Sequence, residues 1–251
     1  MKHPNLNISL TLYTLLMLLI PIGFWANTYT WTLAQSAQTP DLNQFLILLT
    51  TTGGSKPYAI GFSIVFTLIL AYFVRRQYRP LTVIAVCICA VVGTQAIKTG
   101  AKAIFKEPRP YVVQLAEQIH ISTADFYALK KPEKRELIAH TPHNPDEQIL
   151  SDYQQHELGY SFPSGHTTFA VAWLLLVVGF TQSWRKGSRI AARCLVALWA
   201  AGVLYSRVKL GAHFPMDLFA STLIVWAWHI VLFRYGLPYF HQRFGQPIKA
   251  A

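Results

Sequence analysis

The sequence predicts an all-α integral membrane protein with six transmembrane helices and a small helical cap outside the cytoplasm. Three observations predict this fold class. Hydrophobic residues make up 53% of the 251 residues and charged residues only 13%, whereas soluble domains carry roughly 25% charged residues. Six nearly uncharged runs approach the roughly 20 residues that a helix needs to cross a bilayer. Basic residues gather in short segments between these runs, as in membrane proteins of fixed orientation.

The first predicted span covers residues 8–25. A cleaved signal peptide is the alternative, because Lys2 gives a basic start. However, a signal peptide usually has only 7–15 apolar residues and a small-residue exit, and here the run is longer and ends in Pro21-Ile22-Gly23-Phe24-Trp25. We therefore expect a retained span. Asp41–Thr51 is also apolar but too short to cross, so we expect an interfacial half-helix there.

The other five spans are predicted from uncharged runs of similar character. The fourth and fifth are short for a bilayer and are expected to extend into their flanks. The five spans cover residues 58–74, 81–97, 167–181, 190–205 and 217–233.

Charge placement predicts the orientation of these spans. Of the 11 acidic residues, nine lie between Glu107 and Glu157. Four segments carry eleven basic residues and no acidic residue: 1–7, 75–80, 184–193 and 234–251. The positive-inside rule puts these four segments, and therefore both termini, in the cytoplasm. The net charge of +11 is then mainly a topology signal with some attraction to anionic lipids, and no nucleic-acid partner is expected.

The long polar segment 98–160 lies outside the cytoplasm in this topology. It contains helix-compatible stretches, such as Thr123–Leu129 and Glu133–Ala139, and Pro132, Pro142 and Pro145 are expected to interrupt the segment between such stretches. We expect a small helical cap over the membrane face. Residues 1–251 would then form a single membrane domain.

Three polar blocks lie at the outer ends of the predicted spans. The first holds Lys102 and Arg109, with Pro108 and Pro110 on either side of the arginine. An isolated lysine or arginine near a span usually only anchors the helix at the headgroups. The two prolines stiffen the backbone, and a fixed guanidinium is suited to bidentate contacts with phosphate.

The second block is Pro163-Ser164-Gly165-His166. Serine is a good N-cap, so the block is compatible with a plain turn and helix start. The same geometry offers free backbone N–H groups that bind phosphate. Gly165 lets the backbone approach an oxyanion closely, and His166 stands beside it as a proton donor.

The third block is Ser206-Arg207 followed by His213 and Asp217. If the sixth helix begins near Pro215, the Asp217 carboxylate can reach one imidazole nitrogen and leave the other free to attack. A buried histidine with a helix-capping aspartate is the plain alternative. A charged Arg207 at the membrane edge weakens that alternative, because such residues are usually functional.

Together the three blocks resemble the signature of the type 2 phosphatidic acid phosphatase superfamily, the lipid phosphate phosphatases. The resemblance implies that His213 is the nucleophile and forms a phosphohistidine, that Asp217 orients it, and that His166 protonates the leaving group. It implies phosphate binding by five further residues: Lys102, Arg109, Ser164, Gly165 and Arg207. Three fixed cations could replace a metal, so no metal and no other cofactor is expected.

Within the superfamily, Asp125–Lys130 and Phe162–Ala170 resemble the bacterial phosphatidylglycerophosphate phosphatases. This implies an enzyme of the bacterial inner membrane, and the charge placement described above puts its site on the periplasmic or outer side. Phosphatidylglycerophosphate, phosphatidate, lysophosphatidate and undecaprenyl pyrophosphate all suit such a site. The expected partners are the lipid substrate and the bilayer, with no obligate protein partner.

Three other functions would use parts of the same sequence. A lipid phosphotransferase would use the same residues and is not distinguished by sequence. A transporter with a basic vestibule would need ionisable residues at mid-depth in several spans, and only His229 stands out there. A serine protease would need a hydrogen bond between its catalytic serine and histidine. Ser164 and His166 are only two residues apart on one turn, which is poor geometry for such a pair. The three cysteines, Cys87, Cys89 and Cys194, have neither disulfide nor metal-site spacing.

Overall fold

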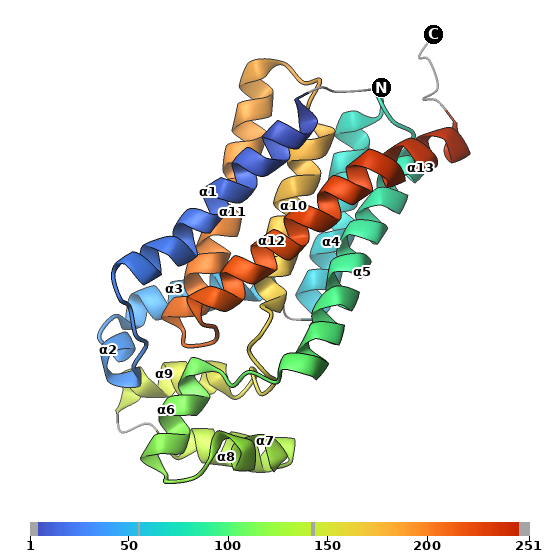
Figure 1. The fold of residues 1–251 in the computed structure, drawn as a ribbon. Coiled ribbons are helices and arrows are strands. Elements are labelled where there is room, and N and C mark those ends of the chain that lie inside the picture. Colours follow the sequence, from blue (N-terminus) through green and yellow to red (C-terminus); the bar gives the residue numbers. More distant parts are fainter. Residues whose placement is uncertain (1–4, 55, 142–143, 246–251) are drawn as a thin grey trace.

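A computed structural model describes residues 5–54, 56–141 and 144–245, and every regular element in these ranges is helical. Five stretches are long and apolar enough to cross a membrane. They contain α1 (Leu6–Ala26), α4 (Lys56–Val74), α5 (Pro80–Phe105), α11 (Lys186–Lys209) and α12 (Pro215–Val231). Figure 1 shows these helices as one bundle, with the start of α1 and residues 237–244 at the end opposite to the small helices α6–α9.

The sixth apolar helix, α10 (Gly165–Phe180), lies in the centre of the bundle. Every residue from Thr167 to Phe180 is buried, and α10 packs against α1, α5, α11 and α12. Its 16 residues are too few for a typical span, so the expected extension into its flanks is wrong. The Ser164 cap fixes its start, and the helix ends at Phe180. The expected extension of the fifth span is confirmed, since α11 runs from Lys186 to Lys209.

Two boundaries differ from the sequence prediction. The third predicted span ended at residue 97, but α5 continues to Phe105, so Lys98 and Lys102 lie on this helix and not in the cap. No helix breaker occurs before Pro108, and the helix ends where Lys106 adopts a left-handed conformation with φ of 45°. The sixth predicted span ended at residue 233, whereas α12 passes through a π-helical turn, Leu232–Gly236, into α13 (Leu237–Phe244).

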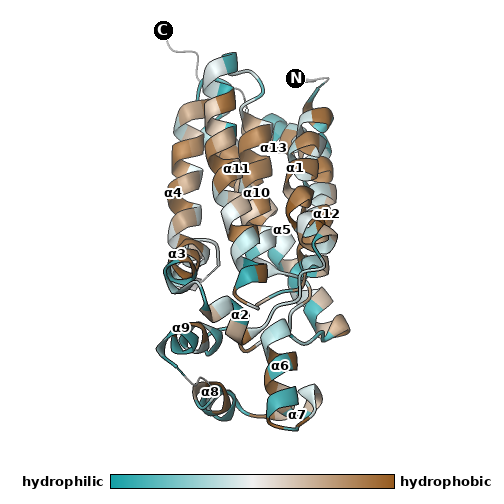
Figure 2. Cartoon of the chain, turned by 90° about the vertical axis from the view of Figure 1, so that its left-hand side faces the viewer, coloured by the Kyte–Doolittle hydropathy of each residue, from teal (hydrophilic) through white to brown (hydrophobic). Residues whose placement is uncertain are grey.

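Two short helices lie between α1 and α4, and four form the polar unit between α5 and α10. The first two are α2 (Leu33–Ala37) and α3 (Pro40–Thr51), and α3 coincides with the expected half-helix. The polar unit, called the cap below, contains α6 (Pro110–Gln118), α7 (Thr123–Ala128), α8 (Lys131–Ala139) and α9 (Pro145–Gln154). Figure 2 shows the hydrophilic colour concentrated on these cap helices and the hydrophobic colour on the bundle.

Two of the three cap prolines lie at boundaries between helices, as expected. Pro132 and Pro145 lie in the first turns of α8 and α9, which are separate helices. A proline costs little there, because the first N–H groups of a helix have no intrahelical partner. Pro142 lies outside the described residues.

The cap is joined to the bundle through a core of its own. Trp31, Tyr111, Phe126, Leu150 and Leu210 belong to one buried cluster, which connects α2, the cap and the end of α11. Two long-range hydrogen bonds reinforce this junction: the Trp31 indole N–H donates to the Lys209 carbonyl at 3.0 Å, and the Tyr111 N–H donates to the Gly211 carbonyl at 3.1 Å. The cap is therefore held against the segment that carries His213.

Candidate active site

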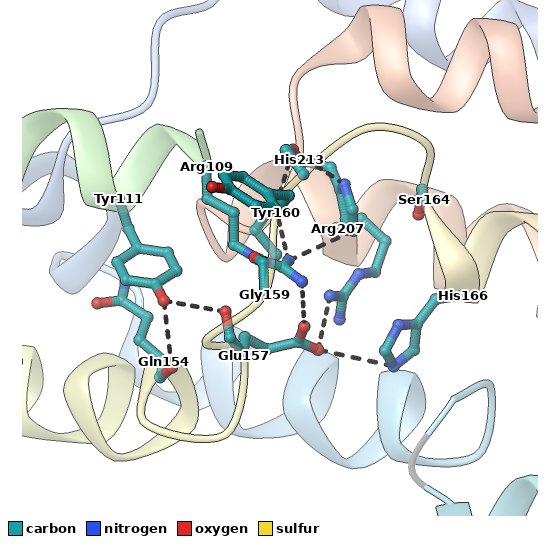
Figure 3. A network of polar contacts seen from close by, with 12 residues as sticks. Arg109, Tyr111, Gln154, Glu157, Gly159, Tyr160, Ser164, His166, Arg207 and His213 are labelled. Carbon is teal, nitrogen blue, oxygen red and sulfur yellow. Dashed lines mark hydrogen bonds and ion pairs between the residues drawn. The ribbon is translucent and has the colours of Figure 1, made fainter. Parts of the chain in front are cut away.

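A cavity of about 540 Å³ begins beneath the cap and continues into the bundle. Five of the eight residues predicted from the sequence line it: Lys102, Arg109, Gly165, His166 and His213. The other three, Ser164, Arg207 and Asp217, do not line the cavity, but each contacts a residue at or beside it. Arg207 and Asp217 are fully buried, as is Ser164. The structure thus brings the three sequence blocks together, as Figure 3 shows for Arg109, Ser164, His166, Arg207 and His213.

His213 is oriented by Asp217, as the four-residue spacing predicts. The imidazole Nδ1 lies 3.2 Å from the carboxylate Oδ2 of Asp217 and 3.2 Å from Oγ of Ser161. The carboxylate is itself fixed by the N–H of Phe214, which donates at 2.9 Å, and by the Ser161 hydroxyl. α12 begins at Pro215, so its first turn supplies this geometry.

The other imidazole nitrogen of His213 faces the cations. Nε2 lies 3.4 Å from Nη1 of Arg109, and a guanidinium can only donate. Both contacts therefore favour the tautomer with hydrogen on Nδ1 and a lone pair on Nε2. Burial, together with Arg109, Arg207 and Lys102, holds the pKa of His213 well below its usual range, which keeps Nε2 available as a nucleophile at neutral pH.

Two arginines from different blocks meet at one carboxylate, that of Glu157. Nη2 of Arg109 lies 2.7 Å from Oε2, and Nη2 of Arg207 lies 2.7 Å from Oε1. Burial raises the pKa of Glu157, but Arg207 and Arg109 outweigh this and hold that pKa well below its usual range. The carboxylate is therefore ionised and bridges the two guanidinium groups.

The arginines are fixed from behind by further contacts. Arg109 donates from Nε to the Gly159 carbonyl at 2.7 Å and from Nη1 to the Ala212 carbonyl at 2.8 Å. Arg207 donates from Nη1 to Oγ1 of Thr50 at 2.9 Å and also to the Tyr153 hydroxyl. Such preorganised cations stabilise charge on a phosphoryl group without reorganising during the reaction.

His166 lies on the opposite side of Glu157 from Arg109, in the first turn of α10 (Figure 3). Its Nε2 is 3.8 Å from Oε1 of Glu157 and its side chain lines the cavity. The nucleophile candidate and the acid candidate thus open onto the same space.

The remaining three predicted residues take different positions. The Ser164 hydroxyl caps α10, accepting from the N–H of Thr167 at 3.3 Å. A side chain at Gly165 would approach Lys98, whose Cδ would lie 3.1 Å from the added Cβ. Lys102 reaches from α5 to the loop before α10, where its ammonium donates to the carbonyls of Tyr160 and Ser161.

Sequence reasoning missed Glu157, Ser161 and Tyr153. All three belong to the cap or to the loop that follows it, and their partners Arg109, Arg207 and Asp217 are 48 or more residues away from them in the sequence. Glu157 is one of nine acidic residues in its segment, and no local spacing distinguishes it. Ser161 lies only two residues before Pro163, so its closeness to the second block was the one available signal.

The sequence matches one protein family and several named bacterial proteins. Residues 80–239 match the model of the PAP2 superfamily. The chain is 41% identical over 231 residues to phosphatidylglycerophosphatase B of Haemophilus influenzae, covering 90% of this chain and 94% of that protein. It is 34% identical over 216 residues to the proteins of the same name from Escherichia coli K12 and Shigella flexneri, covering 84% of this chain and 82% of each.

The family match covers all three sequence blocks and most of the bundle. The resemblance inferred from Lys102, Arg109, the Pro163–His166 turn and the His213–Asp217 pair is therefore confirmed, as is the phosphatase class that it implied. The chain belongs to the PAP2 superfamily.

Proposed function

We propose that this protein is a lipid phosphate phosphatase of the bacterial inner membrane that hydrolyses phosphatidylglycerophosphate to phosphatidylglycerol. Phosphatidate, lysophosphatidate and undecaprenyl pyrophosphate are further substrates of the same site. One observation carries this proposal: the cavity that holds His213, Arg109 and His166 continues between α4 and α5 as an apolar passage. A phosphate group and an acyl chain fit its two ends.

The passage reaches the outer surface of the bundle. Its walls include Ile60 and Ile64 from α4 and Ile88 and Val92 from α5, each more than half exposed. In a membrane these side chains would face lipid tails, so a lipid can enter sideways. Each buried methylene contributes about 0.8 kcal/mol, and long-chain lipids are therefore preferred over water-soluble phosphates.

The reaction proceeds in two displacements at phosphorus. Nε2 of His213 forms a P–N bond as the bond between phosphorus and the lipid oxygen breaks, and His166 gives its proton to that oxygen. Water then attacks the phosphohistidine while His166 takes a proton from it, and the P–N bond breaks to release phosphate. Lys102, Arg109 and Arg207 neutralise the phosphoryl oxygens throughout, which is the main requirement of phosphoryl transfer.

Six spans and an outer cap complete the proposal. α10 is the sixth span. It can be shorter than the others because α1, α5, α11 and α12 surround it, so that it contacts little lipid. The start of α1, the α10–α11 loop and α13 lie together at the end remote from the cap (Figure 1), and these ends hold the basic segments. Both termini are then cytoplasmic, and the active site faces the periplasm.

The test of this function is phosphate release by the purified protein from a panel of the four lipids in the presence of EDTA. We expect release from phosphatidylglycerophosphate, and full activity under chelation, because three cations hold the phosphate. Loss of activity restored by magnesium would contradict the charge scheme. Transfer of the phosphate to added glycerol or lipid, without free phosphate, would identify a phosphotransferase instead.

The topology predicts the labelling of two single cysteines in spheroplasts, in a background lacking the three native cysteines. Asn144→Cys in the cap should react with an impermeant maleimide, and Gly187→Cys should not. Both positions are exposed, and a side chain at Gly187 meets no atom within 4 Å. The reverse labelling pattern would overturn the periplasmic site.

A further inference from the structure

Tyr127, in the cap helix α7, contacts the supports of the phosphate-binding residues. Its hydroxyl accepts a hydrogen bond from the backbone N–H of Arg109 at 3.2 Å. Its ring stacks on the ring of Tyr160, with the two centroids 4.2 Å apart and the two planes at 23°. Tyr127 is half-buried and is not among the described residues that line the cavity. Any effect of this side chain on a bound phosphate therefore passes through other residues.

The hydroxyl contact fixes the backbone of Arg109. This residue is the N-cap of α6, whose first residue is Pro110, so its N–H has no carbonyl partner within the helix. Arg109 is only 4% exposed, and a buried N–H without an acceptor costs free energy. Burial raises the pKa of Tyr127 to about 12, so the hydroxyl is neutral at pH 7. It therefore holds the backbone from which the guanidinium extends toward Glu157.

The ring contact fixes a short segment that holds two cations by its carbonyl groups. The Gly159 carbonyl accepts from Nε of Arg109 at 2.7 Å (Figure 3). The carbonyls of Tyr160 and Ser161 accept from the ammonium of Lys102. None of these three residues belongs to a helix, so the segment depends on side-chain contacts for its position. A ring stacked on Tyr160 therefore helps to place both cations.

Tyr127 lies on a part of the cap that is itself held in place. α7 begins with a capping box, in which Ser122 and Asp125 each bind the backbone N–H of the other at 3.1 Å. The buried Lys134 from α8 donates to the Tyr127 carbonyl at 2.9 Å, and its ammonium lies 5.4 Å from the centre of the Tyr127 ring. The hydroxyl and the ring thus have a fixed position in the cap.

From these two contacts we infer that Tyr127 is a positioning residue, which sets the spacing of Arg109 and Lys102 around the substrate phosphate. The inference rests on the proposed lipid phosphatase function. Cations that are placed before the reaction stabilise the phosphoryl charge without moving, and a displacement of about 1 Å can cost about 10²-fold in rate. The inference also gives a role to Asp125–Lys130, a stretch that no step of the proposed reaction uses.

The test measures inhibition by vanadate of lysophosphatidate hydrolysis in neutral detergent micelles. Vanadate resembles the phosphoryl group in transfer and has no acyl chain, so its inhibition constant reports on the phosphate site. Tyr127→Leu loses the hydroxyl and the stacked ring and should raise this constant at least about tenfold. Tyr127→Phe loses only the hydroxyl and should raise it by less.

The matched control is Ile138→Ala, which removes a buried side chain from the core of the same cap. It should lower Tm, because it leaves a cavity, but it should not change the vanadate constant. An equal rise of this constant in Ile138→Ala and Tyr127→Leu would show only a loosened cap and would overturn the inference.

A second measurement asks whether the ring acts through Lys102. The ratio of the vanadate constants of Tyr127→Leu and Tyr127→Phe gives the effect of the ring. In a Lys102→Met background this ratio should fall, because the stacked segment then has one cation fewer to place. Positions that do not interact would keep the same ratio within about twofold.

An unchanged vanadate constant in Tyr127→Leu, or the same ratio in both backgrounds, would overturn the inference. If Tyr127→Leu does not fold, Tyr160→Leu removes the same stack from the other ring. Its effect on the vanadate constant should also fall in the Lys102→Met background. Absence of phosphate release by the unmodified protein would instead refute the proposed function.

Discussion

Replacing His213 by alanine is expected to lower kcat for lipid phosphates by about 10⁴-fold or more, the scale on which loss of a nucleophile acts in other enzymes. Only Nε2 of this residue faces Arg109 across the cavity with its partner nitrogen held by Asp217. No other imidazole in the described part of the chain combines these two contacts. The loss should appear as phosphate release near the uncatalysed rate.

The matched control is His156→Ala, since this histidine lies one residue before Glu157 and its side chain is exposed. It should keep the unmodified rate. A phosphohistidine hydrolyses in acid. The intermediate should therefore be trapped by rapid quenching in alkali, with substrate that carries a labelled phosphate. Near-normal turnover of His213→Ala, with the protein folded, would refute the assignment of the nucleophile.

The second large effect is expected for His166→Ala, and its size should depend on the leaving group. With a lipid alcohol, which must be protonated as it departs, the rate should fall by about 10²- to 10⁴-fold, as for other general acids. With p-nitrophenyl phosphate the fall should be much smaller, because nitrophenolate leaves without a proton. Rates for both substrates, measured with the same preparations, give the comparison.

An equal loss for both substrates would show that His166 does not act as the acid. The geometry makes this test informative, because His166 also lies 3.8 Å from Glu157 and contributes to the electrostatics of the phosphate site. An electrostatic or structural role would affect both substrates alike. Only a proton donor produces a dependence on the leaving group.

The parts of the site that depend on local geometry could be predicted from the sequence. The spacing between His213 and Asp217 spans one turn at the start of α12, and Ser164 caps a helix that begins at the next residue. Glu157 could not be predicted, because its role depends on two arginines that come from α11 and from the start of α6. Nothing near it in the sequence encodes their approach.

The fold shows the same division. The apolar runs in the sequence predicted where the bundle helices lie. The residues at which these helices begin and end could not be predicted from composition alone. α5 passes the end of the apolar run and carries Lys98 and Lys102 on helix, because no breaker intervenes before Pro108. α10 could not be assigned as the central helix from its sequence, since an apolar run of this length is typical of both a buried helix and a short span.

The central position of α10 has a consequence for the order in which the protein is made. Two of the helices that cover it, α11 and α12, are synthesised after it, and Arg207, His213 and Asp217 come with them. A chain still emerging from the ribosome therefore carries Arg109, Glu157 and His166 without His213, the proposed nucleophile. In the proposed mechanism, catalytic competence appears only when the last hairpin has inserted, so a nascent chain would not act on the lipids around the insertion machinery.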